Sequence, residues 1–293
     1  MIPNNNLSVL PFYTSIEQQN ARKWWIYGRV YPLFCPAGFL LPFQILIPHV
    51  RNNPNITQFK LYDANTGAMV ENVLTALRNT GLTAITFGSL GYDVVVYPGI
   101  MPMTNLSVNG RYYLYAVIDN VSYYSEIFTV VNDTEPYLKI TWWDLDDFVM
   151  DAGRIVYSSY TFTTFKNVLY LQSDIAKPEY IFEEEGETRD GYFFPVKQIS
   201  EKRYRFAFLA SEYLLDVMRF IRMADYAEIE YHGQTYKLDT FLITPEWESN
   251  GDVAAVEAVF DTATVAKKIG RGYTPIGTAG DFNNDFNDDF NNN

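Results

Sequence analysis

The stretch TWWDLDDF holds the side chains best suited to chemistry. Three carboxylates, Asp144, Asp146 and Asp147, follow the adjacent indoles of Trp142 and Trp143. Paired carboxylates serve glycoside hydrolysis, and carboxylate oxygens also bind Ca²⁺. A turn at the end of an aromatic strand uses the same residue types, because Asp favours turns and caps. The sequence favours the turn, and a carbohydrate-binding module or glycan hydrolase that uses Trp142 to Asp147 stays the alternative.

The other reactive side chains are few. Of the two histidines, His49 ends a predicted strand and His232 lies at a predicted hairpin tip, and neither has a neighbouring ligand motif. The one cysteine, Cys35, lies in an apolar stretch and is expected to pack as a small hydrophobe. The sequence has no phosphate-binding glycine loop, dinucleotide fingerprint or nucleophile elbow. We therefore expect a non-enzymatic protein without catalytic residues, metal or cofactor.

Composition predicts a β-rich protein that binds neither nucleic acid nor membrane. Among 293 residues, 17% are aromatic, with 23 Tyr and 21 Phe, and these residue types favour strands. A net charge of −13 disfavours the phosphate neutralisation on which nucleic-acid binding depends. The start has no leader pattern, and the longest apolar stretch is too short to span a bilayer. We expect the chain to be made and folded in a cytoplasm.

The elements that must position these side chains form two predicted domains. Residues 36–133 read as short strands separated by turns, which predicts an immunoglobulin-like β-sandwich with a hairpin about Asp119 and Asn120. Tyr113 and Tyr115 alternate with apolar residues there, so one face of the strand is a candidate partner surface. Residues 134–276 predict an antiparallel β-rich α+β domain with one helix.

Three details of the second domain are specific enough to check. The stretch SEYLLDVMRFIRMADY has an apolar stripe at helical spacing, and Ser211 is placed to cap its first turn. KRYRFAFLA alternates, which puts Tyr204, Phe206 and Phe208 on one face of a strand. IFEEEGETRDG reads as a charged loop, and VAAVEAVFDT reads as the closing strand.

Residues 1–35 predict an extended N-terminal arm. Its distinctive part mixes aromatic and cationic residues, among them Trp24, Trp25, Tyr27 and Arg29. These residues either fill the core beside a strand or anchor the arm on a neighbouring subunit, because Trp, Tyr and Arg dominate interface energetics. Both alternatives stay open.

Residues 277–293 form an Asp/Asn/Phe tail. Phe282, Phe286 and Phe290 recur every four residues, but the Asn and Asp between them are poor helix formers. The tail is either a solubilising segment or a flexible peptide that orders on a partner. We favour docking, because exposed phenylalanine is a liability unless a partner covers it.

Much of the chain resembles a known class of proteins. The stretches LPFYTSIEQQNARKWWIYGRVYPL, GYDVVVYPGIMPM, DGYFFPVKQISEKRYRFAFLASEYLLDVMRFIRMADY and TPEWESNGDVAAVEAVFDT, with the DFNNDFN ending, carry the resemblance. They look like virion structural proteins, of the tail or baseplate type, from phages and prophages of the Bacteroidetes. The resemblance implies a location in the virion and assembly into a symmetric particle with copies of itself and with other virion proteins. It assigns no functional residue. A host surface glycan is the partner that the carbohydrate-binding alternative would take.

Overall fold

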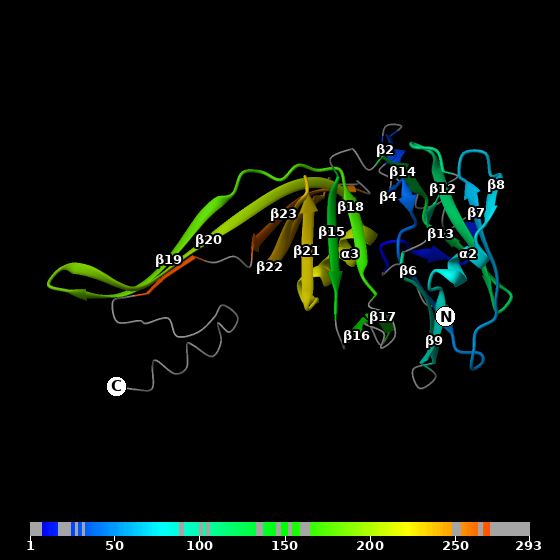
Figure 1. Cartoon of the computed structure of the whole chain (residues 1–293), viewed down its shortest axis with the longest axis horizontal. Coiled ribbons are helices and arrows are strands. Elements are labelled where there is room, and N and C mark those ends of the chain that lie inside the picture. Colours follow the sequence, from blue (N-terminus) through cyan, green and yellow to red (C-terminus); the bar gives the residue numbers. More distant parts are fainter. Residues whose placement is uncertain are drawn as a thin grey trace. The chain divides into compact units, whose positions relative to one another are not determined.

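The computed structural model (Figure 1) describes residues 8–16, 25–26, 29–30, 33–87, 91–99, 102–103, 106–132, 137–144, 148–151, 154–158, 165–247, 253–262 and 266–269. The fold is mainly β, as predicted. Contacts divide the chain into two units, of which the larger takes residues 1–179 and 202–263 and the smaller takes residues 180–201 and 264–293. The division of the sequence into four segments, residues 1–35, 36–133, 134–276 and 277–293, stays a prediction.

The first half of the larger unit is an immunoglobulin-like sandwich. Its first sheet is built around β12 (Arg111–Ile118), which pairs with β7 (Ile56–Asp63) on one side and with β13 (Val121–Ser125) and β14 (Phe128–Val131) on the other. The sheet is extended by β8 (Met69–Asn72), by β1 (Phe12–Tyr13) and by β4 (Leu33–Pro36), which runs parallel to β14. The second sheet has the order β6 (Phe43–Pro48), β10 (Tyr92–Tyr97) and β9 (Thr83–Phe87). The second sheet corresponds to strands B, E and D of that fold, and β7, β12 and the strands that follow β12 in the first sheet correspond to strands C, F and G.

Aromatic rings fill the space between the two sheets. Phe43 lies at the centre, with ring centroids 5.1 Å from Phe12, 5.7 Å from Phe59 and 5.2 Å from Tyr97. All four rings are buried. The chain has a single cysteine, Cys35, so this aromatic cluster holds the two sheets together where many immunoglobulin domains use a disulfide. Cys35 itself is buried, which confirms its predicted packing role.

A tyrosine corner locks the entry to β12. The Ser107 N–H donates a hydrogen bond of 3.1 Å to the Tyr112 hydroxyl, five residues further along the chain. Gly110 lies under the ring, and a Cβ at this position would fall 2.5 Å from the Tyr112 hydroxyl oxygen. Because no side chain fits there, glycine is required for the corner to close. This feature is a hallmark of immunoglobulin-like sandwiches.

The second large sheet is antiparallel and curls back toward itself. Its order is β18 (Asn167–Leu171), β15 (Leu138–Trp143), β21 (Tyr226–Tyr231), β22 (Gln234–Trp247), β23 (Val253–Thr262), β20 (Tyr192–Ser211) and β19 (Glu179–Arg189), and β24 (Ala266–Ile269) also pairs with β20. Beyond β18, the Ala176 N–H donates to the Arg205 carbonyl and the Ser173 hydroxyl donates to the Ala207 carbonyl, both at 2.8 Å. The chain leaving one edge of the sheet therefore meets β20, which gives a barrel-like curl.

The remaining described elements are short. They are β2 (Trp25–Ile26) with β3 (Arg29–Val30), β5 (Gly38–Phe39) with β11 (Pro102–Met103), β16 (Phe148–Asp151) with β17 (Arg154–Ser158), and the helix α2 (Leu74–Asn79). Within the described residues, no helix is both long and apolar enough to cross a membrane.

Several predictions about local elements are confirmed. Asp119 and Asn120 form the turn between β12 and β13, with φ angles of 50° and 64° that match a tight hairpin turn. His232 lies at an exposed hairpin tip, as expected, next to Gly233. On β20, Phe206 and Phe208 are buried on one face, as the alternation predicts.

Three predictions are wrong in part. IFEEEGETRDG is not a loop but most of β19, since the glutamates stand in solvent while the backbone pairs with β20. Ser211 occupies the N-cap of the helix but makes no side-chain capping bond, and the helix α3 (Glu212–Met218) tightens to a 3-10 turn, η2 (Arg219–Met223), and ends there. VAAVEAVFDT does not close the sheet, because β23 lies between β20 and β22.

Candidate interaction surfaces

The predicted interface residues lie mostly outside the described residues. In the arm, Trp25 belongs to β2 and Arg29 to β3, and the two strands pair as a small hairpin. Trp24, Tyr27 and the phenylalanines of the tail, Phe282, Phe286 and Phe290, fall outside. The arm is anchored at both ends, because β1 pairs with β13 and β4 pairs with β14. The segment between β1 and β4 is therefore attached to the first sheet by strand pairing at both of its ends. Its docking on a neighbouring subunit stays a prediction.

Neither tryptophan of TWWDLDDF offers an open ring to a sugar. Trp142 lies on β15 of the second large sheet, and its side chain is buried. Trp143 stacks on Tyr226 of the neighbouring strand with ring centroids 5.3 Å apart, and the Lys166 ammonium lies 3.8 Å from the centre of the same indole. Tyr226 lies on the strand on one side of β15, and Lys166 directly precedes β18 on the other side, so both contacts occupy part of the indole, which is half-buried.

The carboxylates of this stretch do not assemble into a described metal site. Asp144 is buried, and its Oδ1 accepts a 2.7 Å hydrogen bond from the Asp225 N–H, which holds the chain just before β21. Asp146 and Asp147 lie outside the described residues, so the carbohydrate alternative stays a prediction. Among the described residues, no three His, Cys, Asp or Glu side chains are grouped to hold a metal ion.

His49 has a structural partner inside the sandwich. Its Nδ1 lies 2.9 Å and 3.1 Å from the two carboxylate oxygens of Asp93, which is fully buried on β10. A buried carboxylate must be paired or hydrogen-bonded, and His49 supplies that contact. The geometry agrees with the structural role that the sequence favours for this histidine.

The strongest candidate surface is the hairpin that sequence reasoning missed, residues 180–201 of β19 and β20. Its turn is Asp190–Gly191, with φ angles of 53° and 80°, which suit a two-residue hairpin turn. Cross-strand contacts stabilise it, since the Gln198 amide donates to Glu184 at 2.6 Å and Lys197 lies 3.8 Å from Glu185. The described end of the chain, β24, adds a third strand along residues 197–200.

This hairpin exposes large aromatic side chains. The exposed fractions are 61% for Tyr180, 67% for Phe182, 73% for Tyr192 and 49% for Phe193. The alternation of Tyr180 and Phe182, and the Asp–Gly pair after them, were signals of a strand and a turn. The run of glutamates concealed them, because consecutive charges usually indicate a solvated loop.

A second surface is the outer face of the first sheet, which carries a cluster of tyrosines. Tyr62 stacks on Tyr113 at 5.4 Å with an interplanar angle of 11°, and it meets Tyr115 edge-on at 6.0 Å. Tyr115 in turn packs against Tyr124 at 5.1 Å. Burial raises the pKa of Tyr113, and the neighbouring hydroxyls of Tyr62 and Tyr124 raise it further. The sequence predicts that one of the two faces of this strand meets a partner, and since Leu114 and Ala116 are buried on the other face, the tyrosine cluster is the candidate.

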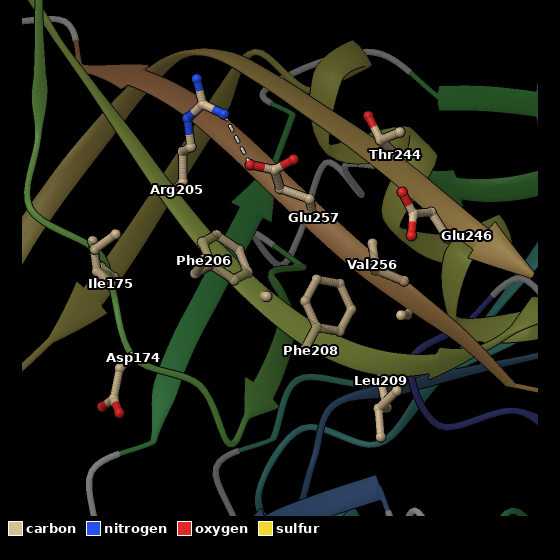
Figure 2. Close-up of a pocket in the computed structure, with 13 residues that line it drawn as sticks. Asp174, Ile175, Arg205, Phe206, Phe208, Leu209, Thr244, Glu246, Val256 and Glu257 are labelled. Carbon is tan, nitrogen blue, oxygen red and sulfur yellow. Dashed lines mark hydrogen bonds and ion pairs between the residues drawn. The ribbon is translucent and has the colours of Figure 1, made fainter.

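A third surface is a groove on β20, β22 and β23 of the second large sheet, shown in Figure 2 and called the β20 groove below. Residues 174–176, 205–209 and 255–257 line it together with Thr244 and Glu246, and its volume is about 910 Å³. The register places Glu257 between Ala207 and Thr244, and Ala255 between Leu209 and Glu246, in rows that cross β20, β23 and β22. The groove is thus an apolar strip with carboxylates spaced along it.

Charge in the β20 groove centres on Arg205. Its guanidinium donates to Glu257 and to Glu179, each at 3.1 Å, and the contact with Glu257 is drawn in Figure 2. The hydrogen bond to Glu257, followed by that to Glu179, raises the pKa of Arg205 above its ordinary value. Asp174, at the rim, accepts a 2.6 Å hydrogen bond from the Tyr231 hydroxyl. Carboxylates therefore outnumber the single cation around the groove.

No family model matches the chain, and no curated protein matches it either.

Proposed function

We propose that the chain is a non-enzymatic structural subunit of a phage virion, in the tail or baseplate, which assembles with copies of itself and with other virion proteins. The observation that carries the proposal is the hairpin of residues 180–201. It holds four large aromatic side chains that are about half exposed to solvent or more, which is unusual for residues of this size. Aromatic anchors of this kind contribute most of the energy of protein–protein association when a partner buries them.

The charges on the hairpin favour binding of a partner through the aromatic side chains over binding through the strand edge. Glu183, Glu184, Glu185 and Glu187 are exposed on β19, the last strand in the sheet order. Charged side chains on an edge strand oppose its pairing with another edge strand. The glutamates therefore disfavour indiscriminate strand addition, while the aromatic rings stay available to a partner with matching pockets.

The resemblance of the sequence to virion proteins supports the same proposal. An immunoglobulin-like sandwich with an aromatic core is a rigid scaffold on which such a hairpin can be presented. Trp142 is buried, and Trp143 packs against Tyr226 and Lys166, so both indoles contribute to the fold of the second large sheet. Their packing favours an assembly role over sugar binding at this stretch.

The test replaces two rings of the hairpin. We expect Phe182→Ser combined with Phe193→Ser to give a folded protein, because both side chains are exposed, that is excluded from purified particles. Phe39→Ser is the matched control, since Phe39 is an exposed phenylalanine on β5. Quantitative mass spectrometry of particles measures incorporation, and a wild-type copy number that is a multiple of three or six supports a ring position. Absence of the wild-type chain from particles removes the proposal, and normal incorporation of the double variant removes the role of the hairpin.

A further inference from the structure

We propose that the β20 groove holds the arm loop, residues 18–32, of a second copy of this chain. The inference rests on the proposed function, because it names one contact by which copies assemble. It concerns a different surface from the hairpin, so the two can be tested separately. Each copy carries one loop and one groove, and such a contact is heterologous, which allows copies to close into a ring.

The first reason is the apolar strip of the groove. Leu209 is 44% exposed, and Ala207 and Ala255 on the same side of the sheet are also exposed. The groove volume of about 910 Å³ lies near the top of the range of about 300–1,000 Å³ found for ligand sites. This is room for more than one bulky side chain, and the arm loop supplies Trp24, Trp25 and Tyr27.

The second reason is charge, which distinguishes the two ends of the chain. Among the residues that line the groove, three are acidic, Asp174, Glu246 and Glu257, and one is basic, Arg205, which is paired with Glu257. Residues 18–32 contain Arg22, Lys23 and Arg29, and the single carboxylate of Glu17 directly before them leaves the segment with a net positive charge, which complements this surface. The tail, residues 281–293, contains four aspartates and no cation, so the groove repels it. Complementary charge fixes which segment docks and raises the association rate.

The third reason is the geometry of the loop. Its base is fixed, because Phe12 and Tyr13 pair with β13 on one side and Leu33–Pro36 pair with β14 on the other. A loop held at both ends loses less conformational entropy on docking than a free terminus does. Its two halves of about eight residues each reach at most about 26–29 Å from the base, at 3.3–3.6 Å per residue. The segment can therefore extend away from the sheet that anchors it while the entropic cost of its docking stays low.

The decisive experiment is photocrosslinking with the full chain. A benzophenone amino acid takes the place of Leu209, and isotopically light and heavy chains are mixed before irradiation. We expect crosslinks from position 209 to residues 18–32, including light–heavy pairs that only two copies can form. Val108 is the matched control position, since it is also 44% exposed and lies outside the groove. Crosslinks within one copy only, to residues 281–293, or to no part of the chain each overturn the inference.

A charge exchange shows that the contact is specific. Arg22→Glu with Lys23→Glu should weaken self-association measured by sedimentation, and adding Glu246→Lys should restore most of it. Asp239→Lys, an exposed position elsewhere on β22, should restore nothing. Trp25→Ala should weaken association about 30-fold, since removal of an aromatic anchor costs about 2 kcal/mol and 1.4 kcal/mol is a factor of ten. Equal rescue by Asp239→Lys would contradict a contact at this groove.

The outcomes separate this inference from the proposed function. If position 209 gives no light–heavy crosslink while the hairpin double variant still fails to enter particles, only the groove assignment is lost. If the crosslink forms but the wild-type chain is absent from particles, the virion assignment is lost and self-association by the arm loop stands.

Discussion

The aromatic residues of the sandwich and those of the hairpin differ in what covers them. In the sandwich, Phe43 touches three other buried rings, and the tyrosines on the outer face of the first sheet pack on one another. On the hairpin, Phe182 and Tyr192 are two-thirds exposed or more. A ring in a wide sheet has neighbours on the strands at both sides, whereas a ring on a narrow hairpin has few. The same residue type therefore stabilises the fold in one region and is available to a partner in the other.

The largest expected effect contrasts one phenylalanine from each region. Phe43→Ala should lower the free energy of unfolding by about 3–5 kcal/mol, because it opens a cavity among Phe12, Phe59 and Tyr97. Phe182→Ala should change it by less than about 0.5 kcal/mol, since the side chain is 67% exposed. Urea denaturation of the two variants measures both values. A loss above about 2 kcal/mol in the Phe182 variant would show that its own subunit uses this ring.

The next effect is an alkaline loss of stability that originates in the sandwich. Burial raises the pKa of Tyr123 from an ordinary value of 10.0 to about 12, and the charge of Asp119 adds to the rise. Because the pKa is higher in the folded state, the contribution of Tyr123 is intact below about pH 10 and is lost as the pH rises through about 12. The loss is on the order of 2–3 kcal/mol at most, since a tenfold change in acidity corresponds to about 1.4 kcal/mol.

Urea denaturation across this pH range, for the wild type and Tyr123→Phe, measures the effect. The variant lacks the ionisable hydroxyl, so its stability should fall less steeply above pH 10, while the difference between the two proteins stays constant from pH 7 to pH 9. Parallel curves up to pH 12 would show that Tyr123 is not the group whose ionisation opens the sandwich.

The sequence was sufficient for the fold class and for the hairpins with strong turn residues. Asp119–Asn120 and His232–Gly233 were found because few residues tolerate positive φ, so the turn chemistry is local. The sequence did not predict the position of β23 within the sheet. This strand pairs with β20 on one side and with β22 on the other, so it is not the closing strand. Pairing partners of that kind depend on the whole sheet, and a single strand pattern does not encode them.

The candidate surfaces were harder to predict than the fold. Alternation alone predicts that Tyr113 and Tyr115 lie on one side of β12, and their shared contacts with Tyr62 confirm this placement, while a partner at this face stays a prediction. The sequence did not predict the hairpin of residues 180–201, because the run of glutamates indicated a solvated loop although the aromatic residues beside it alternate as in a strand. The β20 groove was also missed, because it needs the register between β20, β23 and β22, which brings Leu209, Ala255 and Glu246 into one row.

The smallest expected effect tests a single hydrogen bond within the sandwich. Tyr112→Phe removes the hydroxyl that accepts the Ser107 N–H at the tyrosine corner, and it should cost about 1 kcal/mol, the usual net value of one such bond. Tyr62→Phe is the control, because Tyr62 contributes its ring to the outer cluster and should lose less than about 0.5 kcal/mol. Urea denaturation distinguishes the two. Equal losses would mean that hydroxyl groups across the sandwich are equivalent, and the contrast between the regions would then depend on ring burial alone. A loss confined to Tyr112 would show that the corner also fixes where β12 begins, and β12 carries the tyrosine face.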